Sequence, residues 1–154
     1  MHDTFTSYQV SNNDDPDFDK DGLPDAWERD FLGGEGVSDG AQDTDMDGLD
    51  DEGEYIAGTG PTNPADVFFL YTGSSGGGAD LRFDMIPADG SYYVDLGRFY
   101  SLECAVGAVS NLFVDVPEAT NIPAIAGPFI YTNFLGVSNV PRFYRGKVWL
   151  QTTN

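Results

Sequence analysis

The sequence predicts a mostly β protein in which two acidic, cation-binding loops with short helices precede a compact antiparallel β-sandwich. Three observations lead to this prediction. Residues 16–66 repeat one twelve-residue acidic pattern, residues 67–154 consist of short β-rich runs between turn residues, and the charge is unevenly divided. Residues 1–66 hold 19 of the 26 acidic side chains, and the whole chain has a formal net charge of −19. We therefore expect an N-terminal extension over residues 1–15, tandem repeats over 16–66 and a β-sandwich domain over 67–154.

The N-terminal extension contains one short run with strand character. Thr4–Val10 alternates polar and apolar residues, with Tyr8 and Val10 on one face, and a polar break follows it. A lone strand needs a sheet edge with which to pair. This run is expected either to fold back onto its own β domain or to add to the edge of a neighbouring copy and build a fibre.

Both acidic repeats fit the pattern D-x-D-x-D-G-x-x-D-x-x-E, which spaces oxygen ligands as a calcium loop does. Positions 1, 3, 5 and 9 offer carboxylates, position 7 offers its carbonyl, and the glutamate at position 12 can bind with both oxygens. The predicted ligands are Asp17, Asp19, Asp21, Leu23, Asp25 and Glu28 in the first loop, and Asp43, Asp45, Asp47, Leu49, Asp51 and Glu54 in the second. The sequence therefore predicts two calcium ions. The loops are EF-hand-like but lack an entering helix, because Asn12–Pro16 is polar and ends in proline.

Each loop is expected to run into a short helix. Trp27 and Phe31 give the first helix an apolar stripe that ends before Gly33, and the second helix carries Tyr55 and ends at Gly58. The plainer interpretation of each loop is a solvated acidic turn that binds nothing. Two complete tandem matches, each followed by an apolar helix, favour calcium binding over that interpretation.

The second half of the chain is expected to form the β-sandwich. The predicted strands cover residues 67–71, 81–86, 92–95, 99–106, 112–116, 128–132 and 142–151. The glycine-rich run over 73–78 is expected to be a hairpin connection, because it lacks the lysine of a phosphate-binding loop. Cys104 lies among apolar residues and is expected to be a packed core thiol.

The acidic repeats resemble thrombospondin type 3 repeats and the calcium loops of dockerins. The segment from Glu54 to Pro64 is similar to the E-Y-x-x-G-T-D-P-T-N-P ending of bacterial versions, with Gly60 in place of the aspartate. The runs Gly97–Glu103 and Arg142–Val148 resemble a small C-terminal β-sandwich module that follows such repeats in large secreted bacterial proteins. The resemblance implies an extracellular, non-catalytic module used for spacing, attachment or display.

Several other classes of function are disfavoured. The acidic leader argues against nucleic acid and anionic membranes as partners, because phosphate binding needs clustered Lys and Arg. The sequence has no apolar stretch of roughly eighteen residues for membrane insertion. His2 is the only histidine, so a nucleophile would lack its usual base, and no enzyme activity is expected. Hydrolysis by a pair of carboxylates would need two acidic side chains held on opposite sides of a cleft. The sequence gives no sign of such a pair among the candidates Asp84, Asp95, Glu103 and Asp115.

The leading functional hypothesis is a calcium-stabilised structural module that is secreted or at the cell surface, in a more specific version a self-assembling fibre or surface-layer subunit. Loops of this kind usually work outside the cell, with dissociation constants of roughly 10⁻⁴–10⁻³ M. The alternative is a carbohydrate- or protein-binding accessory module that uses exposed aromatic residues. Adjacent aromatic pairs, with one ring expected to be exposed, occur at Tyr92-Tyr93, Phe99-Tyr100 and Phe143-Tyr144. Ordinary packing of these rings, with scattered tyrosines on the surface, is the plainer interpretation.

Overall fold

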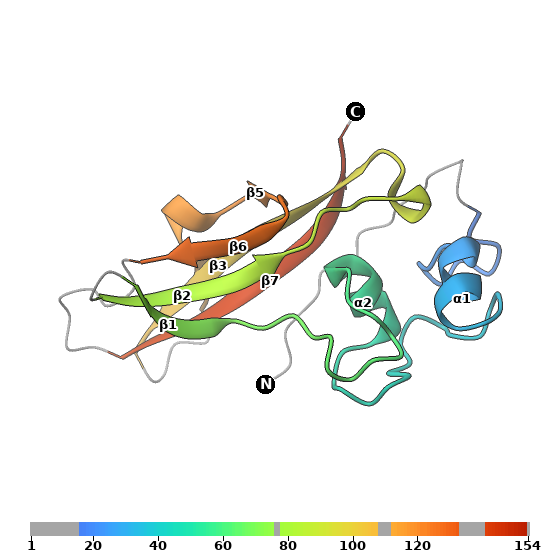
Figure 1. Cartoon of the computed structure of the whole chain (residues 1–154), viewed down its shortest axis with the longest axis horizontal. Coiled ribbons are helices and arrows are strands. Elements are labelled where there is room, and N and C mark those ends of the chain that lie inside the picture. Colours follow the sequence, from blue (N-terminus) through green and yellow to red (C-terminus); the bar gives the residue numbers. More distant parts are fainter. Residues whose placement is uncertain (1–15, 76–77, 108–111, 133–140, 154) are drawn as a thin grey trace.

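The chain is described here from a computed structural model over residues 16–75, 78–107, 112–132 and 141–153. These residues are mostly strands in two antiparallel sheets, together with two short α-helices. The acidic segment carries helix α1 (Asp25–Phe31) and helix α2 (Asp51–Ala57), and both helices lie beside one end of the sheets (Figure 1). The prediction of a mostly β fold is confirmed. Within the described ranges, no helix has the length and apolar character needed to span a bilayer.

Local sequence signals set the limits of both helices. Pro24, with φ −66°, precedes the first turn of α1 as its N-cap residue. Asp50 caps α2, because its side chain accepts a hydrogen bond from the Gly53 N–H at 2.8 Å. Gly58 ends α2 in the left-handed conformation, with φ 79°, which glycine adopts without strain. The predicted end of the second helix at Gly58 is confirmed.

The first sheet has the order β1-β2-β6. Strand β1 (Tyr71–Ser75) pairs with β2 (Gly78–Met85), and the other edge of β2 pairs with β6 (Gly127–Tyr131). The pairing of β1 with β2 confirms the hairpin predicted at the glycine-rich run, although both strands extend into that run. The register places Tyr71 opposite Arg82.

The second sheet is built around the long strand β3 (Leu96–Val106). Strand β7 (Arg142–Thr152) pairs with β3 along its whole length. Two short strands, β4 (Val114–Asp115) and β5 (Ile122–Pro123), pair with the opposite edge of β3. Cys104 of β3 is buried, as predicted.

A single apolar cluster joins the acidic segment to both sheets. Leu23, Trp27 and Tyr55 of the acidic segment are each at most 3% exposed. They share this cluster with Phe83 of β2 and Tyr100 of β3. Burial of a side chain of this kind contributes about 1.5–3 kcal/mol. The loops and the sheets therefore stabilise each other.

Arg98 of β3 is the main polar link between the sheets and the acidic segment. Its guanidinium is buried, and Nε donates to the Ile56 carbonyl at 2.6 Å while Nη2 donates to the Tyr55 carbonyl at 3.3 Å. Its Nη1 donates to the carbonyls of Ile86 and Pro87 at 2.9 and 3.0 Å. Because the carbonyl end of a helix carries partial negative charge, a cation is favoured at this end of α2.

The strand predicted over residues 92–95 is wrong. Ser91–Tyr93 forms a 3₁₀-helix, η1, and Asp95 has a positive φ of 58°. The Tyr93 hydroxyl donates to the Tyr55 carbonyl at 2.9 Å, and the two rings stack with their centroids 5.0 Å apart. This contact with α2 outweighs the β propensity of adjacent tyrosines, because propensity is weak compared with tertiary packing.

Other strand limits also differ from the prediction. The first strand begins at Tyr71 rather than at Val67, and the strand predicted over 112–116 is reduced to β4. Strand β5 was not predicted, and a second 3₁₀-helix, η2 (Pro117–Ala119), lies between these two short strands. Each short strand pairs with β3 at only two positions, so it depends on β3 rather than on its own pattern. The predicted strand Thr4–Val10 lies outside the described residues, and the three-part domain division remains a prediction.

Candidate metal centre

The backbones of the two acidic loops curl in the same way. Position 4 of the pattern is Lys20 in the first loop and Met46 in the second, with φ 65° and 66°. Position 6 is Gly22 in one and Gly48 in the other, with φ 100° and 103°. A residue with a Cβ rarely adopts the conformation at position 6, so the glycines of the pattern are needed for the turn. The shared sequence pattern therefore produces a shared loop geometry.

Hydrogen bonds within each loop hold the carboxylate at position 1 over the turn. The Gly22 N–H donates to Asp17 Oδ2 at 3.2 Å, and the Gly48 N–H donates to Asp43 Oδ2 at 2.9 Å. In the second loop, Asp45 Oδ1 also accepts a hydrogen bond from the backbone N–H of Asp47 at 3.2 Å. Hydrogen bonds from the loop backbone therefore orient these aspartates without a bound ion.

The loops bring eight of the ten predicted carboxylates into close groups, which leave out Asp51 and Glu54. Three groups have ligand oxygens within 4.8 Å of one another: Asp17 with Asp19 and Asp25, Asp19 with Asp21 and Glu28, and Asp43 with Asp45 and Asp47. In the first loop the shared Asp19 connects all five predicted carboxylates. In the second loop the close group contains positions 1, 3 and 5. These groups are close enough to hold a metal ion.

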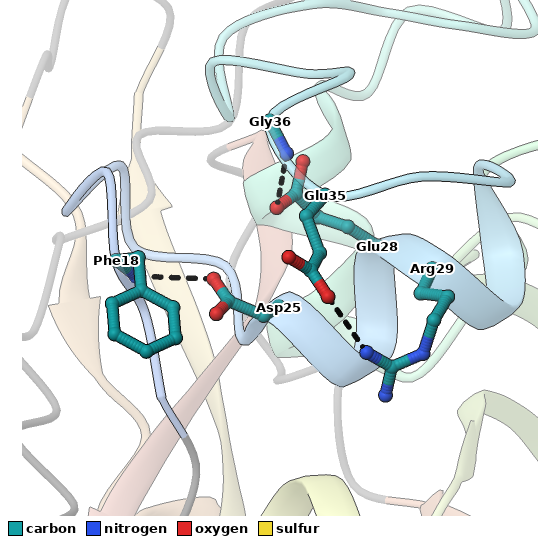
Figure 2. Close-up of polar contacts among 6 residues, drawn as sticks. All are labelled: Phe18, Asp25, Glu28, Arg29, Glu35 and Gly36. Atoms are coloured by element: carbon teal, nitrogen blue, oxygen red, sulfur yellow. Dashed lines mark hydrogen bonds and ion pairs between the residues drawn. The ribbon is translucent and has the colours of Figure 1, made fainter.

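The aspartate at position 9 braces the start of its own loop in both repeats. The Phe18 N–H donates to Asp25 Oδ1 at 3.0 Å, as Figure 2 shows. In the second loop, Asp51 accepts from the Thr44 N–H at 3.1 Å and from the Thr44 hydroxyl at 2.9 Å. Both oxygens of Asp51 are therefore engaged, which suits a ligand that acts through water rather than directly.

Glu28 at position 12 of the first loop is fully buried and holds a second turn of the chain. Its Oε2 accepts from the Gly36 N–H at 3.0 Å (Figure 2). Its Oε1 accepts from the N–H groups of Val37 and Ser38 at 3.1 and 3.3 Å. Backbone donors stabilise the ionised form of a carboxylate. The sequence did not predict this turn, although the glycines around residues 33–36 signal a bend.

Glu54 at position 12 of the second loop has different surroundings. It is fully buried, and within the described part of the chain neither of its carboxylate oxygens has a hydrogen-bond partner. The same is true of one oxygen each of Asp45 and Asp47 in this loop, and of Asp21 Oδ2 in the first loop. Buried polar atoms without partners are rare in folded proteins, because losing water without a replacement costs free energy.

The crowding of these carboxylates appears in their pKa values. Burial, together with repulsion from the charges of Asp45 and Asp47, raises the pKa of Glu54 to about 8. Burial also raises the pKa of Asp21 to about 6, with added repulsion from Asp19 and Glu28. Burial raises the pKa of Asp47 as well. Each shift disfavours a negative charge that a bound cation would favour.

No lysine or arginine of the described residues supplies that positive charge through an ion pair. Arg29 of α1 turns away from the loop and pairs with the exposed Glu35 at 2.8 Å, as Figure 2 shows. Lys20 forms no ion pair within the described ranges. The carboxylate groups therefore remain available to a metal ion.

The leucines at position 7 also pack into the protein. The Leu23 side chain is fully buried in the apolar cluster, and Leu49 packs against that cluster. Their carbonyl oxygens stay predicted ligands. The leucine side chains explain why both repeats have an apolar residue here, because they attach each loop to the core that also holds Trp27 and Tyr55.

Comparison of the chain with models of protein families, with curated proteins and with solved structures gave no match. The resemblance to calcium repeats of secreted proteins therefore stays an expectation from the motifs.

Proposed function

We propose that this chain is a calcium-stabilised structural module of a secreted or cell-surface protein, with two EF-hand-like loops held against a β-sandwich. The Glu54 carboxylate carries the proposal. It is fully buried, its oxygens have no hydrogen-bond partner among the described residues, and burial followed by repulsion from Asp45 and Asp47 raises its pKa. A buried charge needs a partner of opposite sign, and a cation bound between Glu54 and the loop aspartates supplies one.

Calcium suits these donors better than other common cations do. Each loop offers only oxygen donors, and Ca²⁺ takes about six to eight oxygens in flexible geometry. Zinc prefers Cys and His, and neither residue type occurs in residues 16–66. Magnesium requires nearly ideal octahedral geometry and keeps several waters, so it fits a twelve-residue loop with a bidentate glutamate less well. We propose two calcium ions, one for each loop.

The proposed role of the second ion is to fix α2 against the sheets. Glu54 would hold the ion at the N-terminal part of α2, while Arg98 holds the carbonyls of Tyr55 and Ile56 at its C-terminal end. Between these two attachments, Tyr55, Ile56 and Ala57 are buried in the shared core. A helix held in this way resists rotation, which favours a rigid joint over a calcium sensor whose helices open on binding.

Calorimetric titration of the chelator-treated chain with calcium tests the proposal. We expect two ions per chain, one after Asp47→Ala or Asp21→Ala, and none after both substitutions together. Asp89→Ala, which removes an exposed aspartate outside both loops, should leave two. Wild-type protein that takes up no calcium, or a double variant that still binds two ions, would show that the proposal is wrong.

A further inference from the structure

The outer face of the first sheet carries an unusual mixture of exposed side chains. In β2, Leu81, Phe83 and Met85 face the core, so the alternate residues Arg82 and Asp84 lie on the outer face. The register puts Tyr71 of β1 and Ile130 of β6 opposite Arg82, and these two residues are 43% and 45% exposed. Aromatic, aliphatic, basic and acidic groups thus share one exposed sheet surface.

A small hollow opens at the end of this face where the chain enters β1. It has a volume of about 190 Å³, and the residues that bear on its chemistry are Thr59, Asp66, Phe69, Tyr71, Asp84 and Ile86. The rings of Phe69 and Tyr71 lie with their centroids 5.9 Å apart, and Phe69 is 53% exposed. Two adjacent rings therefore form an open apolar wall of the hollow.

The polar groups of the hollow lack partners. Thr59 is only 6% exposed, and its Oγ1 has no hydrogen-bond partner within the described residues. The carboxylates of Asp66 and Asp84 likewise take part in no ion pair or hydrogen bond in the described part of the chain. A buried hydroxyl without a partner is uncommon, and a ligand in the hollow that Thr59 lines is one group that can supply the missing hydrogen bond.

A second hollow continues from the first. Its volume is about 600 Å³, it shares Val67, Phe68 and Phe69 with the first hollow, and it reaches Met46 and Leu49 of the second acidic loop. Met46 is 88% exposed. The groove around Phe69 comprises both hollows, and its larger part is also lined by Asp43, Asp47 and Asp50 of the second acidic loop.

We propose that this groove binds a neutral oligosaccharide. The C–H face of a sugar ring packs against Phe69 and Tyr71, because the negative face of an aromatic ring attracts these weakly positive hydrogens. Sugar hydroxyls donate to Asp66 and Asp84, and they both donate to and accept from the Thr59 hydroxyl. The proposal goes beyond the calcium-stabilised module, because these contacts use side chains other than the proposed metal ligands, although Asp43 and Asp47 also line the larger hollow.

The charges around the groove favour a neutral ligand over an anionic one. Asp66 and Asp84, in a chain with a net charge of −19, repel an anionic glycan. Arg82 stands opposite Tyr71 on the same face and supplies hydrogen-bond donors there. A face that offers both donors and acceptors matches hydroxyl groups, each of which can do both.

Two-dimensional NMR of the calcium-saturated chain tests the proposal. The probes are cellohexaose, laminarihexaose, xylohexaose and mannohexaose, each at up to about 10 mM, so that dissociation constants in the millimolar range are detected. We expect at least one of them to give saturable shifts at residues 59–71 and 82–86. Phe69→Ala and Asp84→Asn should each weaken that binding at least about ten-fold, the loss expected for one good contact.

The controls make the same changes away from the groove. Phe143→Ala truncates a phenylalanine of β7 that is 46% exposed, and Asp89→Asn removes an exposed charge from the loop after β2. Both should leave the binding unchanged. The proposal is overturned if none of the four sugars shifts these residues, or if Phe69→Ala binds as wild type does. Binding of a lysine-rich peptide in the groove, lost in Asp84→Asn and without any sugar binding, would also overturn it.

Discussion

Glu28 and Glu54 stand at the same position of the two acidic repeats, but their carboxylates have opposite surroundings. Glu28 accepts three backbone N–H groups, from Gly36, Val37 and Ser38. Glu54 accepts none within the described residues, although it is equally buried. Backbone N–H groups satisfy the Glu28 carboxylate even without metal, whereas an anionic Glu54 depends on a cation for its partner. We therefore expect the second loop to need calcium more than the first.

Glu54→Gln should have effects of opposite sign with and without calcium. In chelator, the variant should melt at a higher temperature than the wild type, because it removes a buried carboxylate that Asp45 and Asp47 repel. In saturating calcium it should melt at a lower temperature, because it loses a bidentate ligand. Circular dichroism melts measure both. Glu118→Gln, an exposed change in η2, is the control, and a Glu54→Gln variant that melts lower in both conditions would contradict the expectation.

Glu28→Gln should destabilise the protein in both conditions. The amide retains only one acceptor oxygen, and hydrogen bonds to a charged acceptor contribute about 1.5–3 kcal/mol each. The turn over Gly36 and Val37 should therefore loosen even in chelator, which is the reverse of the result for Glu54→Gln. Hydrogen exchange of these two amides measures the loss. Unchanged protection in the variant would show that Glu28 does not hold the turn.

The metal-free protein should lose stability as the pH rises from about 4.5 to about 8. In the folded protein, burial raises the pKa of Glu54 from 4.5 to about 8 and that of Asp21 from 3.8 to about 6. The folded state therefore binds more protons than the unfolded state in this window, and its stability is greatest on the acidic side. Melts in chelator across the window test the sign. A melting temperature that rises steadily from pH 5 to pH 8, at about constant salt, would contradict it.

Calcium should raise the melting temperature, and the gain should grow with pH because calcium and protons compete for the same carboxylates. One site at a hundred-fold excess over its dissociation constant contributes about 2.7 kcal/mol. Sodium chloride at equal ionic strength is the control, since it screens repulsion among the acidic residues without coordination. If sodium chloride reproduces the whole effect, the stabilisation is screening and not specific binding.

Arg98→Met should separate the acidic segment from the sheets. Four carbonyl oxygens each lose a hydrogen bond from the guanidinium, although those of Tyr55 and Ile86 keep a tyrosine hydroxyl as donor, so we expect a loss of about 3 kcal/mol or more. Calcium should then no longer increase the hydrogen-exchange protection of β3, as it should in the wild type. Arg82→Met on the exposed face of β2 should stay within about 0.5 kcal/mol of the wild type. Equal effects of the two substitutions would contradict the role assigned to Arg98.

Local sequence pattern predicts some strands of this protein correctly and fails at others. β-rich runs between turn residues predicted the long strands β2, β3 and β7, because both signals are local in the sequence. The pattern failed at Tyr92 and Tyr93, where contact with Tyr55 and α2 sets the backbone, and at β4 and β5, which pair with β3 at two positions each. A residue whose conformation depends on a distant partner carries no local signal of that dependence.

The sequence by itself determined the two acidic loops, because the spacing of their aspartates and glycines is read locally and fixes the curl of the backbone. It also determined the mostly β character of the second half, through short β-rich runs and the turn residues between them. Only the tertiary structure decided that Glu28 is satisfied by the Gly36 turn while Glu54 is not, and that Arg98 closes the end of α2. These differences depend on groups 8 to 42 residues apart in the chain, and packing around the shared core is what brings them together.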